Sequence, residues 1–194
     1  PLRLRELSDT LARWLPLVRL DLGGTLVLMR KFDAAHYLRL AEQHGATHSM
    51  LVPVQYQRLM ACPDFDGADL SRLQNKFCTS APFSAKLKAE VLRRMPVGLI
   101  EIYSMTEGGV VCLLPAHEHP DKLHTVGRPA PGSELKVLDE HGNEVPPGTA
   151  GELVGKSPTM MLGYKNQPEK TLEGYWIDPK DGSVWQRMGD VGRV

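Results

Sequence analysis

The sequence predicts an α/β protein in which a mostly parallel sheet with flanking helices is followed by a small antiparallel, barrel-like β subdomain. Between residues 25 and 103, short apolar runs alternate with helical patterns, as expected for βαβ units. After about residue 115, Gly and Pro become frequent and short alternating strands replace helices, which indicates a small sheet or partial barrel. We therefore expect an α/β subdomain over residues 1–120 and a β-rich subdomain over residues 121–194.

Helices are expected where apolar residues recur at helical spacing. Asp33 and Ser84 are suited to cap the helices that follow them, and Gly45 is suited to end one. Pro16 limits how far the most N-terminal helix can run. The predicted helices cover residues 6–20, 34–44, 54–60 and 85–94.

Strands are expected at apolar, β-branched runs that turn residues bound on either side. In the first subdomain these runs cover residues 25–29, 47–54, 76–79 and 95–103. In the second, alternating patterns predict strands over residues 134–138 and 151–156, and turn sequences lie between them at 139–143 and 145–148.

The composition excludes several classes of protein. Lys plus Arg and Asp plus Glu both number 23 in 194 residues, so bulk charge gives no reason to expect a nucleic acid or a membrane surface as partner. Cys62, Cys78 and Cys112 form no CxxC pair, which favours a reduced, cytoplasmic location. No apolar run approaches the roughly 20 residues of a transmembrane segment. The chain begins at Pro1 without a methionine, and we expect it to be part of a longer protein.

Residues 101–109 (Glu-Ile-Tyr-Ser-Met-Thr-Glu-Gly-Gly) concentrate chemically useful groups at the end of a predicted strand. Thr106 can donate to an anionic oxygen, Glu107 can hold a hard cation such as Mg²⁺, and Gly108 and Gly109 allow close approach of a ligand to the backbone. Ligands of open α/β sheets bind beside such strand ends. An ordinary strand-to-loop turn with a solvated glutamate explains the same residues. His117 and His119 are interpreted as surface histidines rather than metal ligands.

Several motifs, taken in order, resemble the adenylate-forming enzymes, a superfamily that includes acyl-CoA synthetases, nonribosomal peptide synthetase adenylation domains and beetle luciferases. Residues 79–84 (Thr-Ser-Ala-Pro-Phe-Ser) are similar to the family's Gly-Gly-Ala-Pro-Leu loop, and residues 103–107 to its Tyr-Gly-x-Thr-Glu signature. Residues 185–192 (Trp-Gln-Arg-Met-Gly-Asp-Val-Gly) resemble Trp-x-x-Thr-Gly-Asp-x-Gly. The segments 126–132, 151–153, 161–164 and 168–171 also match. The greatest likeness is to AMP-forming fatty- or aryl-acid–CoA ligases.

The resemblance implies a nucleotide site for ATP and AMP. Tyr103 would lie along the adenine ring opposite a wall of Ser80, Ala81 and Pro82, and the Ile102 backbone would receive the exocyclic amine. Asp190 would accept hydrogen bonds from both ribose hydroxyls. Ser104 would border the same slot and narrow it, because the family has Gly there. Two further departures from the family are Ser80 in place of Gly and Met188 in place of Thr.

The resemblance also implies the residues around the reacting groups. Thr106 would hydrogen-bond the α-phosphate or the substrate carboxylate, and Glu107 would coordinate Mg²⁺. Gly108 and Gly109 would border the acyl carboxylate, and Val110 would line the acyl pocket. Gly151, Gly163 and Tyr164 are interpreted as structural residues that shape strands and turns.

The implied function is that of an acid–CoA ligase (AMP-forming), which takes a carboxylic acid, ATP and coenzyme A. One alternative is an adenylation domain that loads a carrier protein; the apolar run 110–114 mildly favours a fatty or aryl acid, although a buried strand would look the same. A second alternative is a non-catalytic nucleotide-binding fragment. The family's phosphate loop and lysine-bearing C-terminal domain are absent, so we expect this chain alone to be inactive. The face against which they would pack is compatible with a homodimer.

Overall fold

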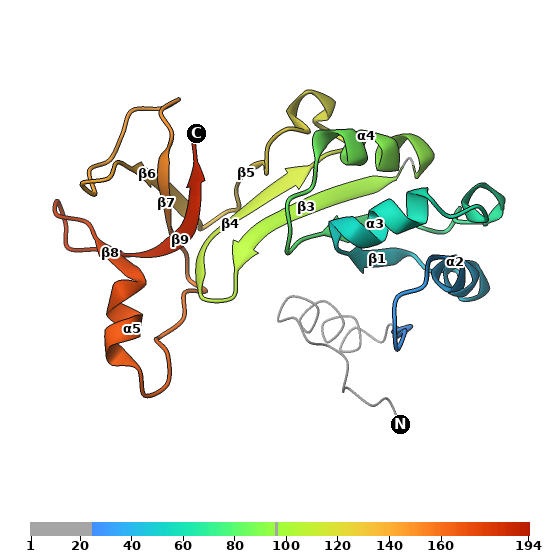
Figure 1. Ribbon diagram of the computed structural model, residues 1–194, viewed down its shortest axis with the longest axis horizontal. Helices are drawn as coiled ribbons and strands as arrows, with labels where there is room; N and C mark the ends of the chain where they lie inside the picture. The colour runs from blue at the N-terminus through green and yellow to red at the C-terminus, as the bar shows by residue number, and fades with distance from the viewer. Residues whose placement is uncertain (1–24, 96) are drawn as a thin grey trace. The chain divides into compact units, whose positions relative to one another are not determined.

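The computed structural model describes residues 25–95 and 97–194 (Figure 1). The predicted helix over residues 6–20 lies outside the described residues. Contacts divide the chain into two compact units. Unit 1 holds the described residues up to 100 together with 115–124, and unit 2 holds residues 101–114 and 125–194. Residues 101–114 thus cluster with the C-terminal part of the chain.

Unit 1 has the predicted alternation of strands and helices, which confirms the α/β class. Strands β1 and β2 are parallel, with His48 opposite Asn75 and Leu51 opposite Cys78. Helix α3 packs against both α2 and α4. In chain order its elements are α2 (Ala34–Gln43), β1 (His48–Leu51), α3 (Pro53–Met60), β2 (Asn75–Cys78), α4 (Ala85–Arg94) and the start of β3 (Gly98–Met105), with short 3₁₀ turns at Phe65–Gly67 and Pro120–Lys122.

The helices of unit 1 begin where side chains satisfy free backbone N–H groups. The carboxylate of Asp33 accepts from the His36 amide at 2.7 Å, and the Ser84 hydroxyl accepts from the Leu87 amide at 3.3 Å. Helix α3 begins at Pro53, whose fixed φ suits the first helical position. The same proline shortens the preceding strand, which ends at Leu51 and not at residue 54.

One strand prediction was wrong. Residues 25–29 form no strand and are largely exposed, Val27 being 37% accessible. Their apolar, β-branched composition suits a strand, but a strand also needs a hydrogen-bonded neighbour. Among the described residues, no strand pairs with residues 25–29.

The first sheet has the strand order β1-β2-β3-β4-β5, where β4 is Gly108–Pro115 and β5 is Arg128–Pro129. Figure 1 shows β3 and β4 as a long hairpin. The prediction that a strand ends near Tyr103 and opens into a loop was wrong, because β3 continues to Met105 and only Thr106 and Glu107 form the turn. Two-residue connections join antiparallel strands, so this end of the sheet is antiparallel.

Unit 2 contains a second sheet with the strand order β6-β7-β9-β8. The pairs β6–β7, β7–β9 and β8–β9 are antiparallel, and the sheet is open rather than closed into a barrel. Strands β6 and β7 have the bounds that the alternating pattern predicts. The elements are β6 (Glu134–Leu138), β7 (Gly151–Lys156), α5 (Pro168–Glu173), β8 (Tyr175–Ile177) and β9 (Val184–Gly192).

Each unit has its own buried core. In unit 1, the fully buried Tyr56 stacks on Phe83 with ring centroids 5.5 Å apart, and its hydroxyl donates to the Phe77 carbonyl at 3.0 Å. Unit 2 has two clusters. The first consists of Val110, Cys112, Val137, Leu153 and Met188, and the second of Leu138, Val154, Trp176 and Trp185.

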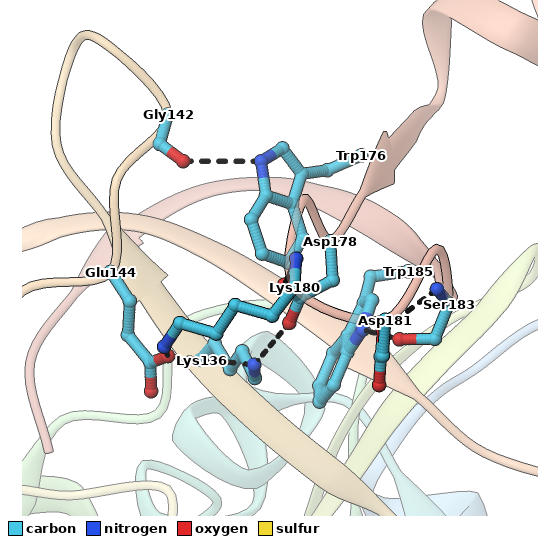
Figure 2. A network of polar contacts seen from close by, with 9 residues as sticks. All are labelled: Lys136, Gly142, Glu144, Trp176, Asp178, Lys180, Asp181, Ser183 and Trp185. Carbon is cyan, nitrogen blue, oxygen red and sulfur yellow. Dashed lines mark hydrogen bonds and ion pairs between the residues drawn. The ribbon is translucent and has the colours of Figure 1, made fainter.

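A charged network lies beside the two tryptophans of the second cluster of unit 2 (Figure 2). The Lys136 ammonium lies 2.5 Å from the Asp178 carboxylate and 3.4 Å from Glu144. It also lies 4.9 Å from the centroid of the Trp185 ring, within the range of a cation–π contact. The network therefore ties β6 to the turn between β8 and β9.

Candidate nucleotide-binding site

The β3–β4 turn presents the two residues predicted to face the phosphates. Thr106 is exposed, and the Glu107 side chain is partly buried. The Glu107 Oε1 accepts a hydrogen bond of 2.6 Å from the Tyr164 hydroxyl, and the Glu107 carbonyl accepts one of 2.8 Å from the Met161 amide. The turn is therefore attached to the segment before α5 through both its backbone and its carboxylate.

Gly108 and Gly109 are required by packing within unit 2. Both have positive φ, +93° and +80°. A Cβ at residue 108 would lie 2.5 Å from the Met160 Cα, and a Cβ at residue 109 would lie 2.6 Å from the Met188 Sδ. Protein atoms thus fill the space beside both glycines, and Val110 is fully buried in the first core cluster. The role of these three residues beside the acyl group stays a prediction.

Tyr103 and Asp190, predicted to hold adenine and ribose, are in direct contact. The Tyr103 hydroxyl donates to the Asp190 Oδ2 at 2.8 Å, although the residues are 87 positions apart. Partial burial, followed by this bond to a carboxylate, raises the pKa of Tyr103 well above its usual value. The phenol therefore stays protonated and acts as a donor, while the exposed Asp190 keeps its other acceptor sites for a ligand.

An irregularity in β9 places Asp190 beside Tyr103. Between the pairs Glu152–Val191 and Val154–Arg187, strand β7 advances two residues while β9 advances four. The extra residues form a bulge, and Gly189 within it has φ +73°. A bulge changes the direction of the side chains around it. Gly189 supplies the residue that can adopt positive φ, and Asp190 supplies the carboxylate.

The three residues of the predicted adenine wall lie in unit 1. Ser80 has φ +74°, a conformation that favours glycine, at the position where the resembled family has Gly. Ala81 and Pro82 are exposed, and with Val54, Gln57 and other residues of unit 1 they line a cavity of about 500 Å³. The sandwich of an adenine between this loop and Tyr103 stays a prediction, as do the contacts of Ile102 and Ser104, which lie partly buried in β3.

The donor set at the turn fits one Mg²⁺ ion. Residues 25–95 and 97–194 contain no group of three His, Cys, Asp or Glu side chains that could hold a metal by itself. Mg²⁺ in nucleotide sites is bound through one or two carboxylates, with phosphates and water completing the shell. Glu107 supplies one carboxylate, whose Oε1 accepts from Tyr164 and whose Oε2 has no hydrogen-bond partner among the described residues.

Tyr164 contacts a predicted site residue, although its sequence context predicted only a structural role in shaping a turn. It lies 57 positions after Glu107, so no local pattern connects the two. The available signal was its place in the matched segment 161–164, directly after Gly163.

Fold and motifs together are those of the adenylate-forming enzymes. The chain belongs to the AMP-binding enzyme family, whose sequence pattern matches residues 8–165. This confirms the resemblance on which the predicted roles of the motifs rest.

Curated relatives and solved structures agree with this membership. The chain is 36% identical over 174 residues to a feruloyl-CoA synthase of Amycolatopsis sp., with 89% of the chain and 34% of the relative covered. It is 36% identical over 177 residues to an indoleacetate–CoA ligase of Aromatoleum aromaticum, covering 89% and 33%. The amide bond synthetase McbA of Marinactinospora thermotolerans has a TM-score of 0.85 at 33% identity, covering 96% of this chain and 37% of that one.

The chain spans about a third of the length of these curated relatives. ATP-bound MatB of Rhodopseudomonas palustris has a similar fold, with a TM-score of 0.79 at 28% identity, covering 97% of this chain and 36% of that one. Within the part of the chain that the structure describes, no helix is long and apolar enough to cross a membrane.

Proposed function

We propose that this chain carries nucleotide-binding residues of an AMP-forming acid–CoA ligase. The observation that carries the proposal is the contact of Tyr103 with Asp190 in unit 2. This contact joins the two residues predicted to bind adenine and ribose. The curated relatives of the chain include a feruloyl-CoA synthase and two CoA ligases.

The proposed reaction has two steps. A substrate carboxylate oxygen attacks the α-phosphorus of ATP, and pyrophosphate leaves to give an acyl-adenylate. The thiol of coenzyme A then loses its proton and attacks the acyl carbon, and AMP leaves. Both steps depend on orientation and on neutralising charge around the phosphates.

The residues of this chain would hold and orient the nucleotide. Tyr103 would contact one face of the adenine, and Asp190 would accept from the ribose hydroxyls. Thr106, exposed at the turn, would donate to the α-phosphate or to the acid. Glu107 would hold Mg²⁺, which supplies positive charge next to the phosphate oxygens.

The acceptor of the acyl group distinguishes the main alternative. A fatty acid–[acyl-carrier-protein] ligase of Streptomyces coeruleorubidus is 32% identical over 185 residues, so loading of a carrier protein is the second candidate. Both candidates share the adenylation step. The homodimer and the cytoplasmic location stay predictions.

The adenylation step is tested by acid-dependent exchange of pyrophosphate into ATP in the full-length protein, with aryl, fatty and amino acids compared. We expect exchange with an aryl or fatty acid, followed by acyl transfer to coenzyme A. Strong exchange with amino acids, or transfer only to a carrier protein, would overturn the assignment to CoA ligases.

The same preparation tests the nucleotide site through the change Asp190→Ala. We expect AMP to bind at least about 10-fold more weakly in calorimetry, because hydrogen bonds to a charged group contribute about 1.5–3 kcal/mol. Asp121→Ala removes an exposed carboxylate that is paired with Lys122 at 3.5 Å, and it serves as the matched control. Equal AMP affinity of the wild type and Asp190→Ala would remove Asp190 from the site.

A further inference from the structure

We propose that Tyr164 is a positioning residue whose hydroxyl holds the Glu107 carboxylate in the orientation that binds the Mg²⁺ of the nucleotide. This inference rests on the proposed function and assigns a role to a residue outside the predicted site. It starts from the 2.6 Å hydrogen bond between the Tyr164 hydroxyl and the Glu107 Oε1.

The contact has the chemistry of a strong, directional hydrogen bond. A phenol has one O–H donor, and an ionised carboxylate is an acceptor with two oxygens. Bonds between O–H groups and carboxylates are typically 2.5–2.7 Å long, and the observed distance falls in this range. Within residues 25–95 and 97–194 only Oε1 of this carboxylate accepts a hydrogen bond, so Oε2 is available to a cation.

Tyr164 is itself held in place by its neighbours around α5. Its backbone amide donates to the Thr171 Oγ1 at 2.9 Å, and the Thr171 hydroxyl donates to the Gln167 carbonyl at 2.9 Å. The Lys170 ammonium lies 4.9 Å from the centroid of the Tyr164 ring, as in a cation–π contact. The ring therefore presents its hydroxyl from a fixed position.

The same segment also fixes the backbone of the turn. The Met161 amide donates to the Glu107 carbonyl at 2.8 Å, and the backbone of Met160 packs directly on Gly108. A glutamate at a hairpin tip would otherwise sample many rotamers, and their loss on metal binding would lower the affinity.

Tyr164→Phe separates positioning of the carboxylate from a general structural role. In the full-length protein we expect the affinity for Mg²⁺ in the presence of ATP to fall about 10-fold, as is typical when a hydrogen bond to a metal ligand is removed. AMP binding in EDTA should change less than about twofold, because it needs no metal-binding carboxylate. Calorimetry measures both quantities on the same preparation.

Tyr175→Phe is the matched control, because it removes a tyrosine hydroxyl of β8 that donates to the Met161 carbonyl at 3.2 Å rather than to Glu107. We expect it to leave Mg²⁺ affinity close to that of the wild type. Glu107→Gln and the double variant Tyr164→Phe/Glu107→Gln complete a cycle. The double variant should be no weaker than Glu107→Gln alone, because both changes act through one carboxylate.

Three results would overturn the role of Tyr164 while leaving the nucleotide site intact. They are unchanged Mg²⁺ affinity in Tyr164→Phe, an equal loss of AMP binding in EDTA, and additive losses in the double variant. Failure of the wild type to bind either nucleotide would instead overturn the proposed function, and this inference with it.

Discussion

At the scale of single residues, the site depends on side chains that hold one another as well as on those expected to touch a ligand. Tyr103 donates to Asp190, and Tyr164 donates to Glu107. Both phenols face carboxylates, so both are donors that orient an acceptor group. The pKa of Tyr164 is raised, first by its bond to Glu107 and then by desolvation.

Ser80 gives a residue-scale prediction about backbone strain in the predicted adenine loop. Its φ of +74° is costly for any residue with a Cβ. We therefore expect Ser80→Gly to be about 1 kcal/mol more stable than Ser80→Ala, because both lose the hydroxyl and only alanine keeps the Cβ. Urea unfolding of the two variants measures the difference, and a more stable alanine variant would contradict it.

At the scale of elements, the charged network of unit 2 holds β6 against the β8–β9 turn (Figure 2). The Asp178 side chain is 3% exposed and the Lys136 side chain 19%. The hydrogen bond from Lys136, aided by the Lys180 amide, lowers the pKa of Asp178. The pair is therefore a shielded contact between β6 and the turn that follows β8, a strand that is not a neighbour of β6 in the sheet.

Removing Lys136 should destabilise unit 2 in a pH-dependent way. Lys136→Met leaves the Asp178 carboxylate buried without its ammonium, which should cost about 1.5–3 kcal/mol in urea unfolding at pH 7. Because the folded-state pKa of Asp178 is lowered, this stabilisation is present above the unfolded-state pKa of about 3.9. It is lost as the pH falls further, so the two proteins should converge in acid.

The matched control for this prediction is Lys180→Met. The Lys180 side chain is 75% exposed and lies 3.5 Å from Glu144. A surface pair of this kind contributes about 1 kcal/mol or less. An equal loss of stability in both variants would show that the buried pair has no special role.

At the scale of the whole molecule, each unit has its own core, and unit 1 encloses a lysine. Lys76 is fully buried, and its ammonium donates to the carbonyls of Met95 at 2.9 Å and Val97 at 2.6 Å. Burial lowers the pKa of Lys76 to about 8. Protonation of this amine is thus less favourable in the folded chain than in the unfolded one.

The consequence is a gain in stability at alkaline pH. Between about pH 8 and the unfolded-state pKa of about 10.4, the unfolded chain binds the extra proton, so stability rises with pH. Relative to Lys76→Met, the wild type should gain about 1 kcal/mol per pH unit near pH 9. Urea unfolding of both proteins from pH 7 to pH 10 measures this, and a constant difference between them would contradict it.

Local sequence patterns were sufficient to predict several helices and strands and the family of this protein. Capping residues, periodicity and turn sequences placed α2, α4, β6 and β7 close to their observed bounds, because those signals act over a few residues. The ordered motifs identified the family, which the match over residues 8–165 confirms. The prediction of a strand at residues 25–29 was wrong, because an apolar run contains no information about whether a partner strand is available.

Only the tertiary structure decided which motif residues touch. Tyr103 meets Asp190 across 87 positions, and Glu107 meets Tyr164 across 57. These contacts follow from the two-residue β3–β4 turn, from the bulge in β9 and from the close packing of Met160 on Gly108. Each depends on register and on backbone approach between distant segments, which periodicities of 2 and 3.6 residues do not encode.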